Sequence, residues 1–173
     1  TAYEIVDCDW SSDVCSSDLT ALLGWGQSFV TGYSLPGGYD IPDTNVQLYV
    51  VVTNKTPWNA YRGFGKDAQS FVMDRIMDHV ARETGRDRTA VRLANFIPAD
   101  DFPHSQPSGA MLDSGNYQGA LAQLLEGIDY AGWRARQREL FGQGRRVGLG
   151  LGQELTPEGC AMPGALMISA YDS

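Results

Sequence analysis

The feature that most constrains this chain is an apolar repeat of helical period between residues 67 and 84. An apolar residue recurs at every fourth position, with two methionines beside the series: Ala68, Val72, Ile76, Val80, Met73 and Met77. Charged side chains occupy the opposite side, so the pattern predicts an amphipathic helix with one face in a core. Gly85 follows and predicts the C-terminal end of that helix.

Weaker patterns on both sides of this helix predict an α/β fold, in the sense of mixed helices and strands. Residues 46–54 are β-branched and aromatic, which predicts a buried strand, and Asp87 and Pro98 bracket a predicted short helix at 87–97. The other predicted segments are a loop at 55–66, a loop at 98–116, a glycine-rich strand at 146–155 and a final strand at 165–173. Residues 117–128 and 130–141 are predicted to form two helices or one bent helix, because Gly127 and Asp129 weaken the middle.

Residues 9–19, DWSSDVCSSDL, differ from the rest of the chain and show neither a helical nor a strand period. The string reads as an in-frame translation of a common sequencing-library adapter, and the alternative is a polar surface loop. We therefore interpret 9–19 as non-native, treat 1–8 as of uncertain origin, and assign 20–173 to one partial domain.

The charge balance disfavours nucleic acid as a partner, because 21 acidic residues outnumber 13 basic ones. The arginines at 82–92 and 134–146 are interleaved with acidic or apolar residues, which predicts solvated helix faces. The three cysteines and two histidines do not have the spacing of zinc ligands. The longest apolar runs, such as residues 48–52, are far too short to span a bilayer. The expected location is the cytoplasm, with export of the folded protein to the periplasm as the alternative.

Three other features favour ordinary structural roles. The motif GLGLG at 148–152 lacks the last glycine and the following helix of a dinucleotide-binding site, which favours a strand with a bare glycine face. Glu154 and Glu158 could form a carboxylate pair for acid–base chemistry, but surface positions are favoured. His79 is four residues before Glu83, and this spacing predicts a surface pair on the long helix.

The loop AYRGFG at 60–65 is the strongest candidate for chemistry. Its glycines permit backbone conformations closed to other residues, and it leads directly into the long helix. Available N–H groups, the positive end of a helix dipole and an aromatic ring could together hold an anionic or oxo-bearing group beside a planar substrate. The alternative is a strand-to-helix turn with a packed Phe64.

Residues 53–85, TNKTPWNAYRGFGKDAQSFVMDRIMDHVARETG, resemble the large, molybdopterin-binding subunit of the xanthine dehydrogenase and aldehyde oxidase family. The resemblance continues back through GGYDIPDTNVQLYVVV and forward through LANFIPADDFP, LDSGNYQGAL and RRVGLGLG. It implies that Arg62, Gly63 and Gly65 bind the cofactor, with the backbone of Arg62 beside the ligands of molybdenum. It also implies that Phe64 flanks the substrate.

The same resemblance implies a second substrate-lining stretch at 154–156, in which Thr156 contacts the substrate. It implies a molybdenum hydroxylase, an oxidoreductase that hydroxylates aldehydes or N-heterocycles with water as the oxygen source. The cofactor would be molybdopterin in its cytosine dinucleotide form, and electrons would pass to iron–sulfur and FAD partner subunits. No membrane or nucleic-acid partner is implied.

Departures from the family pattern refine these expectations. Carbon monoxide dehydrogenases of this superfamily carry a cysteine-containing loop where this chain has Gly63 and Phe64, which favours hydroxylation over CO oxidation. The string GQG occurs at 142–144, but the family's Gly-Gln-Gly cofactor motif is expected further downstream and is missing there, as is the family's general-base glutamate. We therefore expect a fragment that has no catalytic residue and is inactive alone. Two other hypotheses stay open: a non-catalytic α/β binding or assembly module, and a different enzyme using Glu154 and Glu158.

Overall fold

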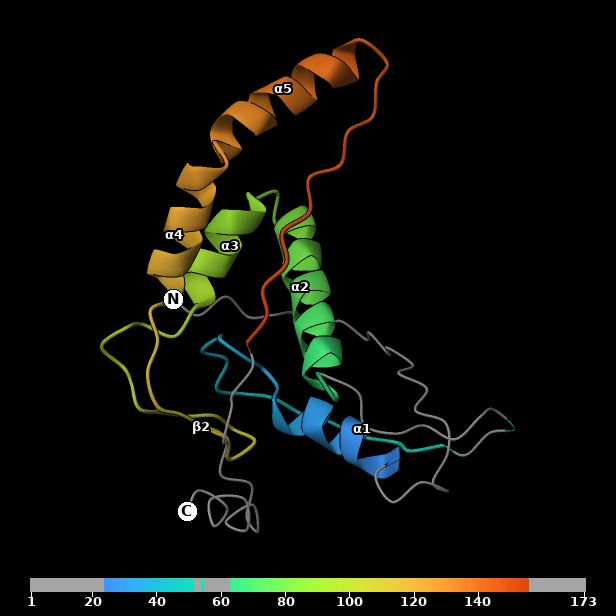
Figure 1. Ribbon diagram of the computed structural model, residues 1–173, viewed down its shortest axis with the longest axis vertical. Coiled ribbons are helices and arrows are strands. Elements are labelled where there is room, and N and C mark those ends of the chain that lie inside the picture. The colour runs from blue at the N-terminus through green and yellow to red at the C-terminus, as the bar shows by residue number, and fades with distance from the viewer. Residues whose placement is uncertain (1–23, 52–53, 55–62, 156–173) are drawn as a thin grey trace, which may run out of the picture.

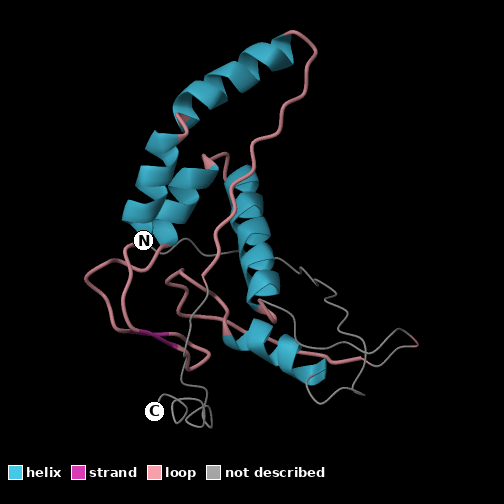
Figure 2. Cartoon of the chain, viewed as in Figure 1, coloured by secondary structure: helices cyan, strands magenta, loops and turns pink. Residues whose placement is uncertain are grey.

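The computed structural model describes residues 24–51, 54 and 63–155, in which helices are joined by long loops (Figure 1; Figure 2). The elements are α1 (Gly24–Tyr33), α2 (Lys66–Glu83), α3 (Arg88–Asn95), β1 (His104–Ser105), β2 (Met111–Leu112), α4 (Tyr117–Gly127) and α5 (Tyr130–Gly142). The two strands pair antiparallel, with His104 opposite Leu112. The mixed class is confirmed, with helices dominating. No helix in these ranges is both long and apolar enough to cross a membrane.

Helix α2 lies where the apolar period predicts it, but its buried face is rotated by one residue. The fully buried positions are Gln69, Met73, Met77 and Ala81, and the series that begins at Ala68 is only half-buried. The methionines belong to the same core cluster as Val91 of α3, which packs on this side of α2. Gly85 ends the helix as predicted, with φ of 66°, a conformation that favours glycine.

The predicted helix boundaries further along the chain are confirmed. The carboxylate of Asp87 caps α3 by accepting a hydrogen bond from the backbone N–H of Thr89 at 2.8 Å. Helices α4 and α5 are separate because Asp129 adopts φ of 49° between them and caps α5 through the N–H of Gly132 at 3.1 Å.

The predicted strand at 46–54 is wrong over its described residues. Residues 46–51 form no strand and are largely exposed, with Tyr49 at 75%. A strand exists only when its backbone groups pair with a neighbour, and no described segment pairs with this one. The strand pair β1–β2 lies instead inside 98–116, where a loop was predicted, and α1 covers residues for which no element was predicted. The predicted strand at 165–173 lies outside the described residues, as does 9–19.

Residues 145–155, which we call the strap, return from the end of α5 alongside α2 (Figure 1). Side chains along the strap alternate between half-buried and exposed, as predicted for a strand. The predicted strand is nevertheless wrong, because no described backbone segment pairs with the strap, and its hydrogen bonds at Val147, Leu149 and Gln153 are made with side chains. The carbonyl of Val147 accepts from Gln137 Nε2 at 2.7 Å, and that of Leu149 accepts from Arg88 Nη1 at 2.6 Å. The helices beside the strap can offer side-chain donors, but their backbone groups are already paired within each helix and cannot form a strand ladder with it.

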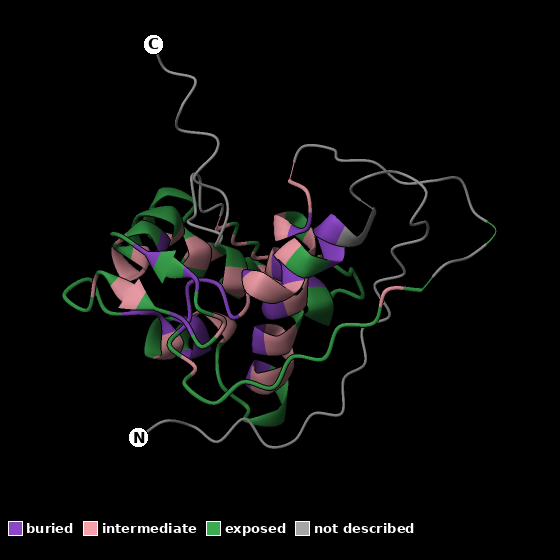
Figure 3. Ribbon diagram, turned by 90° about the horizontal axis from the view of Figure 1, so that it is seen from below, coloured by how far each residue is buried: buried purple, intermediate pink, exposed green. Residues whose placement is uncertain are grey.

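The core lies between α2, α3 and α4, and it includes aromatic residues from the loops. Tyr39 stacks on Phe96 with ring centroids 5.0 Å apart, and both are almost fully buried. Buried residues gather between the helices, whereas the loop at 41–51 and much of α5 are exposed (Figure 3). The strap therefore crosses the helices on the outside of a well-packed core.

Candidate functional site

The loop predicted to carry the chemistry is described from Gly63 onward, and Arg62 lies outside the described residues. Three consecutive residues adopt positive φ: 101° at Gly63, 39° at Phe64 and 97° at Gly65. Glycine adopts this conformation readily, but a residue with a side chain does so at a cost of about 1–2 kcal/mol. Such strain is concentrated at functional sites, so the conformation of Phe64 supports a binding role for the loop.

Gly65 connects the loop to α1 and α2 through its own backbone. Its N–H donates to Asp67 Oδ1, and its carbonyl accepts from Thr31 Oγ1, each at 3.0 Å. A Cβ atom at this position would lie 2.3 Å from the carbonyl oxygen of Gln27, which explains the need for glycine. The backbone groups of Gly65 are therefore used inside the chain, and its predicted contact with cofactor stays a prediction.

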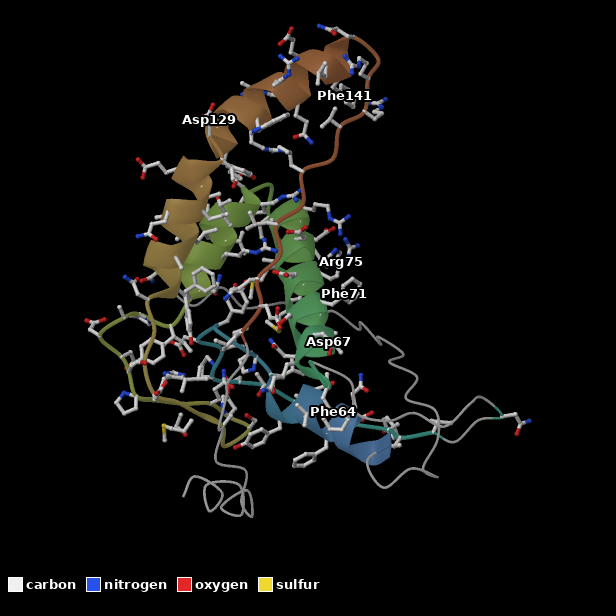
Figure 4. The ribbon with its side chains drawn as sticks, in the orientation of Figure 1. Phe64, Asp67, Phe71, Arg75, Asp129 and Phe141 are labelled. Carbon is white, nitrogen blue, oxygen red and sulfur yellow. The ribbon has the colours of Figure 1, made fainter. Side chains whose placement is uncertain are left out.

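Phe64 lies where α1 meets the start of α2 and is half-buried (Figure 4). A Cβ atom at Gly26 would lie 3.2 Å from Phe64 Cζ, so the tip of the ring packs closely on that glycine of α1. The N–H groups of Gly63 and Phe64 make no hydrogen bond within the described part of the chain. The loop thus holds two donors that are unpaired among the described residues, beside a ring that is held from one side.

A second polar cluster, which we call the Asp–Arg ladder, joins α2 to α3. It consists of Asp74 and Asp78, one turn apart on α2, and Arg88 and Arg92, one turn apart on α3. Arg92 Nη1 donates to Asp78 Oδ1 at 2.9 Å, and Nη2 donates to Asp74 Oδ1 at 3.1 Å. Arg88 Nη1 lies 3.6 Å from Asp78 Oδ2.

The ladder corrects the prediction that these arginines lie on solvated helix faces, because Arg92 is 0% exposed. The ladder was not predicted from the sequence, although a signal was present: two aspartates and two arginines with the same four-residue spacing in consecutive helices. Burial opposes the charge of Arg92, but nearby Tyr39, Asp78 and Asp74 outweigh it and raise the pKa of Arg92. Arg92 is therefore a permanent cation that balances the carboxylates.

The surroundings of Arg92 contain polar atoms that are buried without a hydrogen-bond partner among the described residues. They include Arg92 Nε, Tyr39 Oη and Gln153 Oε1. Burial also raises the pKa of the Tyr39 hydroxyl, so this group stays protonated at neutral pH. The cluster holds fixed charges and a neutral hydroxyl, which is typical of a structural anchor.

A pocket of about 180 Å³ lies between α3, α4 and the strap. Its walls are mostly apolar, with Arg92 and Gln153 on one side and Glu154 at the strap end. The pocket shares no lining residue with the loop at 63–65, so the structure does not bring the two together. Glu154 is exposed, as expected, and Thr156 and Glu158 lie outside the described residues.

Other predicted positions have ordinary surroundings. His79 Nδ1 lies 4.0 Å from Glu83 Oε1, which confirms the predicted surface pair. No group of three His, Cys, Asp or Glu side chains within the described ranges is placed to hold a metal ion.

Comparison with known families decides what kind of domain carries this strained loop. A family model described as "Molybdopterin cofactor-binding domain" matches residues 6–96, more than half of the chain. The chain belongs to this family. The match includes the loop at 63–65, α2, α3 and the Asp–Arg ladder, and it confirms the resemblance found in the sequence. It also runs across 9–19, but the proposed foreign origin of that segment stays a prediction.

The chain is also similar to large subunits of several oxidoreductases. The "Carbon monoxide dehydrogenase large chain" of Hydrogenophaga pseudoflava is 37% identical over 103 residues, which cover 58% of this chain and 13% of the relative. The "Nicotine 6-hydroxylase large subunit" of Paenarthrobacter nicotinovorans is 32% identical over 127 residues, covering 73% of this chain and 15% of the relative.

A solved structure shows the same arrangement of elements. Quinoline 2-oxidoreductase from Pseudomonas putida 86 superposes with a TM-score of 0.62 at 30% identity, covering 68% of this chain and 15% of that one. The chain thus spans 13–15% of the length of these three proteins.

Proposed function

We propose that the chain forms part of the molybdopterin-binding wall of a larger catalytic subunit, in a molybdenum hydroxylase. The observation that carries this proposal is the strained loop at 63–65, which presents the amides of Gly63 and Phe64 at the start of α2. Molybdopterin carries a phosphate group and the molybdenum that it binds carries oxo ligands, and both kinds of oxygen accept hydrogen bonds from backbone amides. The donors present therefore fit the cofactor of the family to which the chain belongs.

Each residue of the loop has a distinct role in this proposal. The backbone of Arg62 would lie beside the ligands of molybdenum, Gly63 and Gly65 would shape the turn against the cofactor, and Phe64 would orient a flat substrate. Thr156 would contact that substrate from the end of the strap. The bound cofactor would supply the redox chemistry that inserts oxygen from water, and the protein supplies placement and electrostatics.

The favoured substrates are flat aldehydes or N-heterocycles. A half-buried aromatic ring next to the cofactor loop suits a planar molecule, because ring stacking and edge contacts both need a flat partner. Two of the similar proteins are named for heterocyclic compounds, nicotine and quinoline. The position of Gly63 and Phe64, where the resemblance places a cysteine-containing loop in CO dehydrogenases, argues against CO as the substrate.

The remaining parts of the proposal concern the assembly. Partner subunits would carry iron–sulfur clusters and FAD, the cofactor would be the cytosine dinucleotide form, and the enzyme would work in the cytoplasm. We also propose that this chain is inactive alone, since it spans only 13–15% of the length of similar large subunits. The 173-residue chain supplied with molybdopterin should therefore show no turnover.

The test compares two phenylalanines in the enzyme expressed from the complete reading frame, in a host that makes molybdopterin. Phe64→Ala should lower kcat/KM for an aldehyde or heterocycle about tenfold, with molybdenum and pterin content unchanged. Phe71→Ala is the matched control, because Phe71 is 63% exposed on α2 and lies away from the loop (Figure 4). Equal kinetics in both variants would contradict the role of Phe64. Native enzyme that contains neither molybdenum nor pterin would favour the non-catalytic module instead.

A further inference from the structure

The strap ends at Leu155, directly before Thr156 in the sequence, and a hydrogen bond near this end joins it to α2. The backbone N–H of Gln153 donates to Asp74 Oδ2 at 2.8 Å. The hydrogen bonds at Val147 and Leu149 lie further from this end of the strap and use its carbonyl groups. Asp74 is therefore the side chain that determines where the end of the strap lies on α2.

The carboxylate of Asp74 is itself held firmly. Its Oδ1 atom accepts from Arg92 Nη2 at 3.1 Å, and Arg92 also donates to the backbone carbonyl of Asp74 at 3.3 Å. The exposed fractions of these side chains are 17% for Asp74 and 1% for Arg92. A carboxylate between a buried guanidinium and a backbone amide has little freedom to rotate, since each oxygen would lose a charge-assisted hydrogen bond.

Helix α2 relates this anchor to the loop at 63–65. The helix begins directly after Gly65, and Asp74 lies in its third turn. A rise of 1.5 Å per residue places the anchor about 13 Å along the helix axis from Gly65. The same helix therefore begins at the Phe64 loop and, in its third turn, holds the strap shortly before Thr156 in the sequence.

We propose that Asp74, held by Arg92, is a positioning residue that fixes the end of the strap, residues 153–155, relative to the Phe64 loop. The importance of this for substrate binding rests on the proposed function, because that proposal assigns the substrate contacts to Phe64 and Thr156. The anchoring itself rests on the contacts of Asp74, Arg92 and Gln153.

Asp78 offers a matched control within the same ladder. It also accepts from Arg92, at 2.9 Å, and its exposed fraction of 22% is close to that of Asp74. It reaches the strap only indirectly, through Arg88 and the carbonyl of Leu149. Asp74→Ala and Asp78→Ala therefore remove similar charges from Arg92, but only the first removes a direct bond to the strap.

The first experiment measures backbone hydrogen exchange in the full 173-residue chain. Asp74→Ala should speed exchange of the Gln153 amide about tenfold or more, and Asp78→Ala should change it less than about threefold. Unchanged exchange in Asp74→Ala, or equal acceleration in both variants, would overturn the proposal.

A second variant covers the case in which Asp74→Ala does not fold. Gln153→Pro removes the N–H donor and leaves the Asp74–Arg92 pair in place. It should speed exchange at Gly152 and Glu154 while leaving α2 and α3 protected. Native protection at those two positions would overturn the role of the hydrogen bond.

The second experiment uses the enzyme expressed from the complete reading frame. Asp74→Ala should raise KM more than it lowers kcat, with molybdenum content unchanged, and Asp78→Ala should leave KM within about twofold. An unchanged KM in Asp74→Ala would overturn the positioning role. Absence of molybdenum and pterin from the native enzyme would overturn the proposed function and this substrate role with it, whereas the exchange result would still decide whether Asp74 anchors the strap.

Discussion

Replacing Arg92 with methionine should be among the most destabilising single substitutions in the described chain. The side chain is 0% exposed and bonds to both Asp74 and Asp78. Removing one partner of a buried ion pair usually costs about 3–5 kcal/mol, because the remaining charge is left uncompensated. Methionine fills most of the space, so the loss is chiefly electrostatic.

The remaining contacts indicate the lower end of that range. The two aspartates keep exposed fractions of 17% and 22%, which allows partial rehydration. Asp78 still has Arg88 at 3.6 Å, and Asp74 still accepts from Gln153 at 2.8 Å. We therefore expect Arg92→Met to lower the free energy of unfolding by about 3 kcal/mol.

Urea unfolding of the full chain at pH 7, followed by circular dichroism, measures this loss. For an m-value of about 2 kcal/mol/M, the midpoint should fall by about 1.5 M. Arg75→Met is the control, because Arg75 is exposed on α2, and it should change stability by less than about 0.5 kcal/mol (Figure 4).

Neutralising the carboxylates tests the cause of the loss. Adding Asp74→Asn and Asp78→Asn to Arg92→Met should recover a large part of the stability, because the uncompensated charges are gone. A loss below about 1 kcal/mol in Arg92→Met, or no recovery in the triple variant, would refute the electrostatic reasoning.

Three further outcomes follow from local geometry, each measured by urea unfolding. Burial opposes ionisation of Asp87, but hydrogen bonds from Thr89 outweigh it and lower the pKa of Asp87. Asp87→Ala should therefore lower the free energy of unfolding by about 1 kcal/mol at pH 7, and this difference should disappear as the pH falls below about 4. An equal difference at pH 3 would contradict the prediction. Gly65→Ala should lower the free energy of unfolding by at least about 2 kcal/mol, since φ is 97° and the added Cβ would lie 2.3 Å from a backbone oxygen. Gly127→Ala, with open space around it, is the control and should raise the free energy of unfolding by up to about 1 kcal/mol. Unchanged stability in Gly65→Ala would show that the loop is not constrained. Tyr39→Phe should be neutral or stabilising by up to about 1 kcal/mol, because the buried hydroxyl has no hydrogen-bond partner among the described residues. Burial raises the pKa of Tyr39, so the native chain should lose stability above about pH 10 more steeply than the variant. A clear loss of stability at pH 7 would mean that the hydroxyl is bonded.

The sequence by itself determined the features that depend on neighbours along the chain. The four-residue apolar period and Gly85 located α2, Asp87 located the start of α3, and the glycines beside Phe64 indicated a loop with unusual backbone conformations. Helical hydrogen bonds, caps and positive φ all act within a few residues, so these features can be predicted from a short stretch of sequence. The family resemblance also rested on such contiguous motifs.

Only the tertiary structure decided which elements meet. Residues 46–51 and the strap have the composition of strands, but a strand needs a partner edge, and the described fold offers the strap side chains of Gln137, Arg88 and Asp74 instead. Arg92 has the sequence context of a surface arginine, yet the packing of α3 on α2 buries it between two aspartates. These outcomes depend on residues 10 to 79 positions apart. A local sequence pattern does not show which of these polar groups will be buried together, out of contact with water.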